Sequence, residues 1–124
     1  MSPFEGHYPN ENSHSTIEID QIIENYRNLV SDKLNMVVNL SGVQNDTRLF
    51  ADFKEKEKTI KKNNEAALST LGQALKRSYS YNTPYLKEKS IKSARSAYEI
   101  TNRVNMKLLD VFLNQNNLTI DCQQ

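Results

Sequence analysis

The chain has 124 residues, of which 37% are hydrophobic and 25% are charged, and its formal net charge is +1. This length is typical of one domain with a thin core. With only three glycines and three prolines, the sequence lacks the many turns of a sandwich or barrel, so we expect a few long elements.

The charge is divided unevenly along the chain. Residues 1–46 carry two basic and seven acidic side chains (2 − 7 = −5), whereas residues 47–124 carry fourteen basic and eight acidic ones (14 − 8 = +6). Such asymmetry is typical of a protein with a nucleic-acid or acidic partner. It also arises when an acidic segment packs against a basic one, within one chain or across a dimer, and we favour this interpretation.

Residues 1–15 are rich in polar side chains, and we expect a flexible N-terminal tail. A helix is predicted over residues 16–41, where Ser15 and Glu18 form a capping-box pattern. Ser41 and Gly42 should end this helix. Its apolar positions repeat with helical periodicity and form a wide stripe: Ile19, Ile22, Ile23, Tyr26, Leu29, Val30, Leu34, Met36, Val37 and Leu40.

A second helix is predicted over residues 46–79, with Asp46 as its N-cap. Leu49, Phe53, Ile60, Ala67, Leu71 and Leu75 share its apolar arc. The helix could instead break at Asn63–Asn64, which would give four helices. The opposite side of the arc carries four lysines, Lys54, Lys58, Lys61 and Lys62. A solvated helix flank explains these lysines, and a phosphate-binding surface is the alternative.

A third helix is predicted over residues 84–116, because Thr83 can cap it and Pro84 suits its first position. Residues 118–124 should form a short, loosely ordered C-terminal tail. Along the third helix, six residues follow a 3,4 spacing typical of a heptad seam, with small side chains at one end and bulky ones at the other: Ala94, Ala97, Thr101, Val104, Leu108 and Val111.

These elements predict an all-α fold, an elongated three-helix up-down bundle with an antiparallel hairpin and coiled-coil-like packing; the helical domain spans residues 16–117. Three polar residues, Lys33, Glu57 and Asn105, interrupt the apolar arcs. In a hairpin turning near residue 45, Lys33 and Glu57 should face each other. We therefore predict a partly buried ion pair that sets the register. The alternative is that Lys33 extends along the apolar wall to water.

The sequence lacks the motifs of common catalytic and cofactor sites. It has no P-loop, no G-x-G-x-x-G and no Cys/His ligand set. Both histidines, His7 and His14, fall in the predicted tail, where solvated side chains are the simpler interpretation. We therefore expect no enzymatic activity, no cofactor and no metal site.

The predicted location is the cytoplasm. No apolar run approaches the ~18 residues of a membrane span, and residues 1–15 do not resemble a secretory signal. Cys122 is the only cysteine, which fits a reducing compartment. Secretion without a cleaved signal and an intermolecular disulfide through Cys122 are the alternatives.

The leading functional prediction is a helical protein–protein interaction module: an adaptor, chaperone or assembly subunit that packs against a second copy or a partner helix. The expected interface is the seam from Ala94 to Val111 together with the first helix. Four tyrosines, Tyr79, Tyr81, Tyr85 and Tyr98, gather around the second turn. Ordinary turn packing explains them, and a partner-binding patch that includes Tyr81 and Tyr85 is the alternative, because tyrosine is enriched at interfaces. The alternative is a nucleic-acid-binding regulator. Its basic residues would be the four lysines above together with Lys76, Arg77, Lys87, Lys89 and Lys92.

Overall fold

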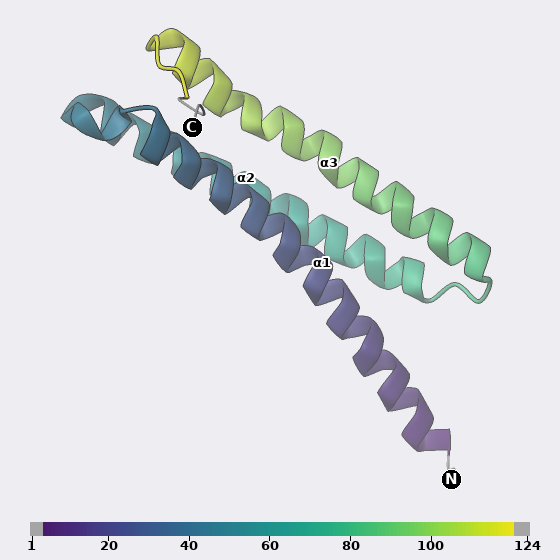
Figure 1. Cartoon of the computed structure of the whole chain (residues 1–124). Coiled ribbons are helices and arrows are strands. Elements are labelled where there is room, and N and C mark those ends of the chain that lie inside the picture. Colours follow the sequence, from purple (N-terminus) through teal and green to yellow (C-terminus); the bar gives the residue numbers. More distant parts are fainter. Residues whose placement is uncertain (1–3, 121–124) are drawn as a thin grey trace.

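The computed structural model of the chain describes residues 4–120, with side chains described from residue 16 onward. It contains helix α1 (Phe4–Leu40), a short 3-10 turn η1 (Val43–Asn45), helix α2 (Thr47–Tyr79) and helix α3 (Pro84–Gln115). The α-helices run up, down and up, and the described residues contain no strand (Figure 1). The predicted all-α helical bundle is confirmed. The predicted alternative of a break at Asn63–Asn64 is wrong, because α2 is continuous.

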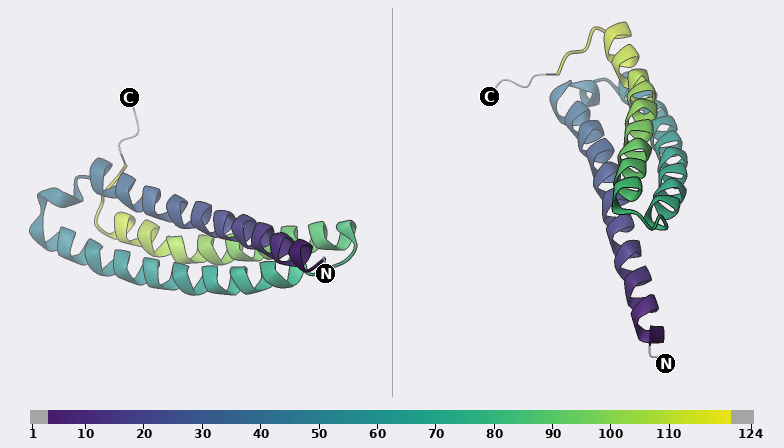
Figure 2. Two further views of the ribbon diagram at one scale, coloured as in Figure 1. Left: turned by 90° about the horizontal axis from the view of Figure 1, so that it is seen from below. Right: turned by 90° about the vertical axis from the view of Figure 1, so that its right-hand side faces the viewer.

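The first helix begins earlier than predicted. Residues 4–15, expected to form a flexible tail, are the first turns of α1, and only residues 1–3 of that segment lie outside the description. The cap at Ser15 was expected to start the helix. A capping preference contributes only about 1 kcal/mol, so it does not stop a helix from extending upstream. In Figures 1 and 2 these turns extend past the α2–α3 turn.

The connection between α1 and α2 follows the predicted turn chemistry. Gly42 has a φ of 79°, in the left-handed region that glycine adopts without strain. The carboxylate of Asp46 accepts hydrogen bonds from the backbone N–H groups of Arg48 at 3.0 Å and Leu49 at 3.2 Å. These bonds satisfy two of the free donors at the start of α2, which confirms Asp46 as the N-cap.

At the other end of the bundle, α2 and α3 are joined by a four-residue turn. Pro84 occupies the first turn of α3 and Thr83 the cap position, as predicted, although the Thr83 side chain makes no capping hydrogen bond. Ser78 and Ser90 face each other across the base of this turn, with their hydroxyl oxygens 2.6 Å apart. Because Ser78 is fully buried, this bond ties the ends of the two helices together.

The core consists of two apolar clusters along the bundle. The cluster near the α1–α2 turn includes Leu34, Phe53 and Phe112, and Leu118 and Ile120 pack against it. These last two residues begin the predicted loose tail of residues 118–124. Residues 121–124, including Cys122, lie outside the described part of the chain. The second cluster lies nearer the α2–α3 turn: Ile19, Tyr26, Leu68, Leu71, Leu75 and Tyr98.

The three helices are not packed symmetrically. The hairpin of α2 and α3 remains close along its length, whereas α1 lies on one side of it and diverges towards its own N-terminus (Figure 2). Side chains of α1 nevertheless reach α3, as in the contact between the rings of Tyr26 and Tyr98, whose centroids are 4.5 Å apart. One face of the α2–α3 hairpin is therefore left without a covering helix. Within residues 4–120, no helix is long and apolar enough to cross a membrane.

Candidate partner interface

The predicted seam of α3 lies mostly outside the core. Ala94 and Leu108 are half-buried against the two apolar clusters, while Ala97 and Thr101 are exposed. Val104 is 64% exposed and Val111 is 49% exposed. Packing within the chain therefore uses only the inner edge of the seam, and its aliphatic side chains remain available to a partner.

A shallow groove runs beside the small end of the seam, between α2 and α3. Its volume is about 170 Å³. It is lined by Ala67, Thr70, Leu71 and Ala74 from α2 and by Ala94, Ala97, Tyr98 and Thr101 from α3. The small side chains allow the two helices to approach closely, and they would allow a third helix to do the same.

The surface around this groove carries no charge. Charged residues are frequent in α3, but they are absent from one side of the helix. Viewed down the helix axis, this side is an arc of about 120° that is bounded by the directions in which Ile100 and Ala94 project. The matching arc of α2 is free of charge from Thr59 to Ala74. We call this surface the uncharged face. It comprises Thr59, Asn63, Ala66, Ala67, Thr70 and Ala74 of α2 and Leu86, Ser90, Ser93, Ala94, Ala97, Ile100, Thr101, Val104, Leu108 and Val111 of α3.

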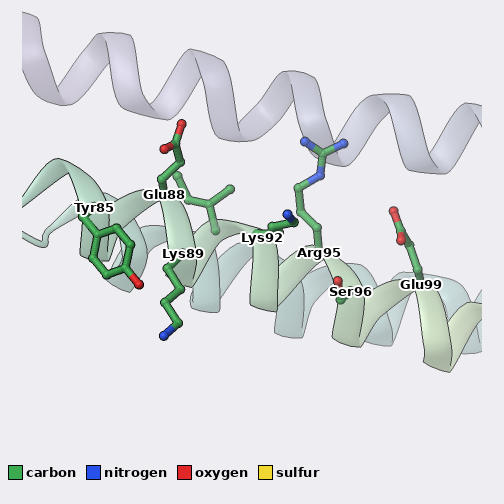
Figure 3. Close-up of a pocket in the computed structure, with 8 residues that line it drawn as sticks. Tyr85, Glu88, Lys89, Lys92, Arg95, Ser96 and Glu99 are labelled. Carbon is green, nitrogen blue, oxygen red and sulfur yellow. The ribbon is translucent and has the colours of Figure 1, made fainter.

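The predicted tyrosine patch is divided in the structure. Tyr98 is buried and Tyr79 is half-buried. Tyr81 and Tyr85 are 49% and 66% exposed. The ammonium group of Lys89 lies over the ring of Tyr85, 5.8 Å from the ring centre. Tyr85 projects from a side of α3 that is not part of the uncharged face (Figure 3), and Tyr81 lies in the turn before α3, so the tyrosines do not form one surface with the seam.

A wide, open pocket of about 980 Å³ lies along the first half of α3. Figure 3 shows Glu88, Arg95 and Glu99 pointing towards α1, and Tyr85 and Lys89 pointing away from it. The pocket thus carries both signs of charge on exposed side chains, and it offers no concentrated site for an ion of either sign.

A polar cluster joins α1 to α3 beside this pocket. The Tyr26 hydroxyl donates a hydrogen bond of 2.6 Å to Glu99 and accepts one of 3.2 Å from Arg95. Burial of the phenol, followed by its bond to Glu99, raises the pKa of Tyr26 above 10.0. The phenol therefore stays protonated at neutral pH, where it serves as a link between helices and not as a base.

The predicted ion pair between Lys33 and Glu57 is wrong. Glu57 instead binds two lysines of its own helix, Lys54 at 3.0 Å and Lys61 at 3.8 Å, and Lys33 is exposed to solvent. Lys33 lies six residues after Arg27, which faces α2. Six residues correspond to about 600°, so Lys33 is rotated by about 120° from the flank that meets α2.

Arg27 and Glu65 form an ion pair between α1 and α2. The guanidinium group of Arg27 binds both carboxylate oxygens, at 2.7 Å and 3.0 Å, and also contacts Glu24 at 2.6 Å. The side chains of Arg27 and Glu65 are 41% and 53% exposed, so solvent weakens the attraction to about 0.2–1 kcal/mol. The hydrogen bond from Arg27 lowers the pKa of Glu65 below its ordinary value of 4.5.

Replacing Glu65 with glutamine should weaken the fold only above acidic pH. Because the pKa of Glu65 is lower in the folded state, its stabilising contribution is complete above the unfolded pKa, near 4.5, and is lost as the pH falls through the folded value. Urea unfolding of Glu65→Gln should show a loss of about 0.2–1 kcal/mol at pH 7 and a smaller loss at about pH 3. The exposed residue Glu55 supplies the control variant Glu55→Gln. An equal loss at both pH values would contradict this assignment.

The four α2 lysines of the nucleic-acid alternative are exposed but do not form a single basic patch. Lys54 and Lys61 share the carboxylate of Glu57, and Lys54 also lies 5.5 Å from the ring centre of Phe50. Lys58 and Lys62 are exposed on the same helix. The remaining basic residues, Lys76, Arg77, Lys87, Lys89 and Lys92, lie towards the α2–α3 turn, and Lys54 is about 33 Å from Lys76 along α2.

A buried polar network joins the middle of α2 to the middle of α3. Asn105, which the sequence marks as a polar interruption, donates to the Ile60 carbonyl at 3.0 Å and accepts from Asn63 at 3.2 Å. The hydroxyl of Tyr98 donates to Asn64. The sequence pointed to Asn63–Asn64 only as a possible helix break and not as a contact with α3. The signal that could have placed Asn64 in the core is a polar residue within an apolar arc. No group of three or more metal-binding side chains is present in the described part of the chain.

The uncharged face is therefore the surface of this chain that combines exposed aliphatic side chains, a groove and freedom from charge. Comparison of the chain with family models, with curated proteins and with solved structures finds no match.

Proposed function

We propose that this chain is a non-enzymatic helical interaction module, an adaptor, chaperone or assembly subunit, that binds a protein partner through the uncharged face. The observation that carries the proposal is the exposure of Ile100, Val104 and Val111, at 56%, 64% and 49%, on a surface free of charge. Contiguous exposed apolar surface marks interaction sites, and the cores of interfaces are depleted of charged residues.

The groove beside these side chains supports binding by helix packing. The groove walls are alanine and threonine, which let the backbone of another helix approach closely, while Val104 and Leu108 supply the larger side chains that such packing requires. Burial of each aliphatic side chain that is now exposed would contribute about 1–2 kcal/mol.

The nucleic-acid alternative draws less support from the charges. Two of the four lysines first considered are paired with Glu57, and acidic residues alternate with the lysines along α2. Binding to phosphates requires basic side chains gathered on one surface, whereas here they are spread along the bundle.

Incorporation of a photoreactive amino acid at position 104 tests the proposal. In cells that produce the chain, irradiation should join position 104 to another protein chain, and the same group at Leu29 should not. Leu29 is a matched control, because it is an aliphatic residue of α1 with 62% exposure.

A second substitution shows whether capture depends on the face. Adding Ser93→Arg, which places a charge on the uncharged face, should lower the yield at position 104 by about tenfold or more, because a buried unpaired charge costs more than 1.4 kcal/mol. Equal capture at positions 29 and 104, or capture that Ser93→Arg does not change, would contradict the proposed function.

A further inference from the structure

We propose that the partner on the uncharged face is a second copy of this chain, packed antiparallel about a two-fold axis so that α3 lies on α3 and α2 on α2. This inference rests on the proposed function and names its partner. An interface of this kind is self-complementary, because the same surface occurs on both copies. Three features support this arrangement: the sizes of the side chains, the charges at the ends of the face, and the area of the face.

The position of the axis follows from how α2 and α3 are aligned. Asn64 is bonded to Tyr98, and Asn105 to Asn63 and to the backbone of Ile60, so residues 64–65 of α2, close to the middle of its arc, lie level with residues 100–101 of α3. An axis crossing both helices at this level maps each half of the face onto the other half. It passes between Ile100 and Thr101.

The side chains that this axis brings together are complementary in size. Ala97 of one copy lies opposite Val104 of the second copy, and Ser93 lies opposite Leu108. The small end of each seam thus receives the bulky end of the other, so that side chains interdigitate as in other tightly packed helix pairs. In a single chain, Val104 and Val111, which lie at the bulky end of the seam, are exposed to solvent.

The charges at the two ends of the α2 arc are complementary under the same axis. Asp52 lies at one end, where it binds Lys56 at 3.6 Å, and Arg77 lies at the other. In the antiparallel pair, each Arg77 lies opposite Asp52 of the second copy, at the rim of the interface. A parallel pair would instead place Val111 beside Asp52 and Lys56, and would remove water from these charges without giving them new partners.

The area of the face is sufficient for a stable dimer. The face extends from Leu86 to Val111 along α3, a length of about 40 Å at 1.5 Å per residue. Each helix is about 10 Å wide, and the α2 part of the face, from Thr59 to Ala74, is about 22 Å long, so the uncharged face offers about 600 Å² of flat surface. The charged rim of α2, out to Asp52 and Arg77, brings the surface of each copy to about 800 Å². Stable interfaces bury about 800 Å² on each partner.

The first test measures the oligomeric state of the whole purified chain. Light scattering should give the mass of a dimer. Val104→Glu should raise the dissociation constant of that dimer by about 100-fold or more, because two carboxylates would be buried near the axis. Leu29→Glu, the same change at an equally exposed aliphatic residue of α1, should leave the dimer intact. Ser93→Arg is a second disrupting variant, and circular dichroism would verify that each variant keeps its helices.

Cysteine cross-linking determines the direction of packing. In a Cys122→Ser background, mild oxidation of a mixture of Ala97→Cys and Val104→Cys chains should give more disulfide-linked dimer than either variant alone. A parallel dimer, or one that uses another surface, would not show this preference, and that result would overturn the proposal.

The outcomes separate this inference from the proposed function. A monomeric chain whose position 104 cross-links to a protein of different mass in cells would overturn the second copy as the partner and would leave the interaction module standing. A monomeric chain that captures nothing at position 104 would overturn both. A dimer that Leu29→Glu dissociates and Val104→Glu does not would also overturn both, because it would place the contact outside the uncharged face.

Discussion

Replacing Phe53 with alanine is expected to lower the free energy of unfolding by about 3–5 kcal/mol. Phe53 has no exposed surface, and its ring lies between that of Phe112, with centroids 6.1 Å apart, and that of Phe50, at 6.5 Å. Truncation would leave a cavity where α1, α2 and α3 meet. Domains of this size have a total stability of about 5–15 kcal/mol, so much of the stability would be lost.

Urea unfolding followed by circular dichroism measures this effect. The neighbouring variant Phe50→Ala is the control, because Phe50 is only half-buried and its truncation should cost clearly less. Both variants should be compared with the parent chain at two protein concentrations, since association through the uncharged face would also raise the measured stability. Equal losses for Phe50 and Phe53 would show that the core is not organised as described.

Removal of a single hydroxyl group in Tyr98→Phe is expected to cost about 1–3 kcal/mol at neutral pH. Tyr98 is 4% exposed and its hydroxyl donates to Asn64, which is 3% exposed. The phenylalanine variant would leave the side-chain amide oxygen of Asn64 buried without this hydrogen-bond donor. Tyr81→Phe, in the exposed turn, should change the stability by less than about 0.5 kcal/mol. Comparable effects of the two substitutions would contradict the role of the buried bond.

The same variant should alter the stability at high pH. Burial raises the pKa of Tyr98 from 10.0 to about 12. Between these values the unfolded chain loses a proton that the folded chain keeps, so the contribution of Tyr98 is complete below pH 10 and is lost as the pH rises through about 12. The parent chain should therefore lose about 1 kcal/mol more than Tyr98→Phe between pH 10 and pH 11. If the free energies of unfolding of the parent chain and of Tyr98→Phe fell equally between pH 10 and pH 11, this assignment would be contradicted.

The polar contacts between α2 and α3 have a further consequence for the interface. Asn63, Asn64 and Asn105 hold α2 and α3 in one alignment. A network of this kind specifies register more than it adds stability. Because the uncharged face is composed of residues from both helices, its shape depends on this alignment. The network in the core therefore positions the residues that a partner would contact.

The end of α1 and the starts of α2 and α3 were determined by sequence signals that act over a few residues. Asp46, Pro84 and the pair Ser41–Gly42 terminate or begin helices through their own backbone preferences and hydrogen bonds. The same local periodicity placed the seam of α3 on one side of the helix. These features depend on neighbours along the chain, so a reading of the sequence alone was sufficient to find them.

Which side chains meet across the helices was decided only by the tertiary structure. Successive helical residues differ by about 100° in direction, so a modest rotation of α1 against α2 replaces one facing pair with another. The sequence analysis named Lys33 and Glu57, whereas packing brought together Arg27 and Glu65. The divergence of α1 and the bond between Tyr98 and Asn64 arise in the same way, because each depends on how whole apolar stripes settle against one another. This packing of the helices leaves the uncharged face without a covering helix.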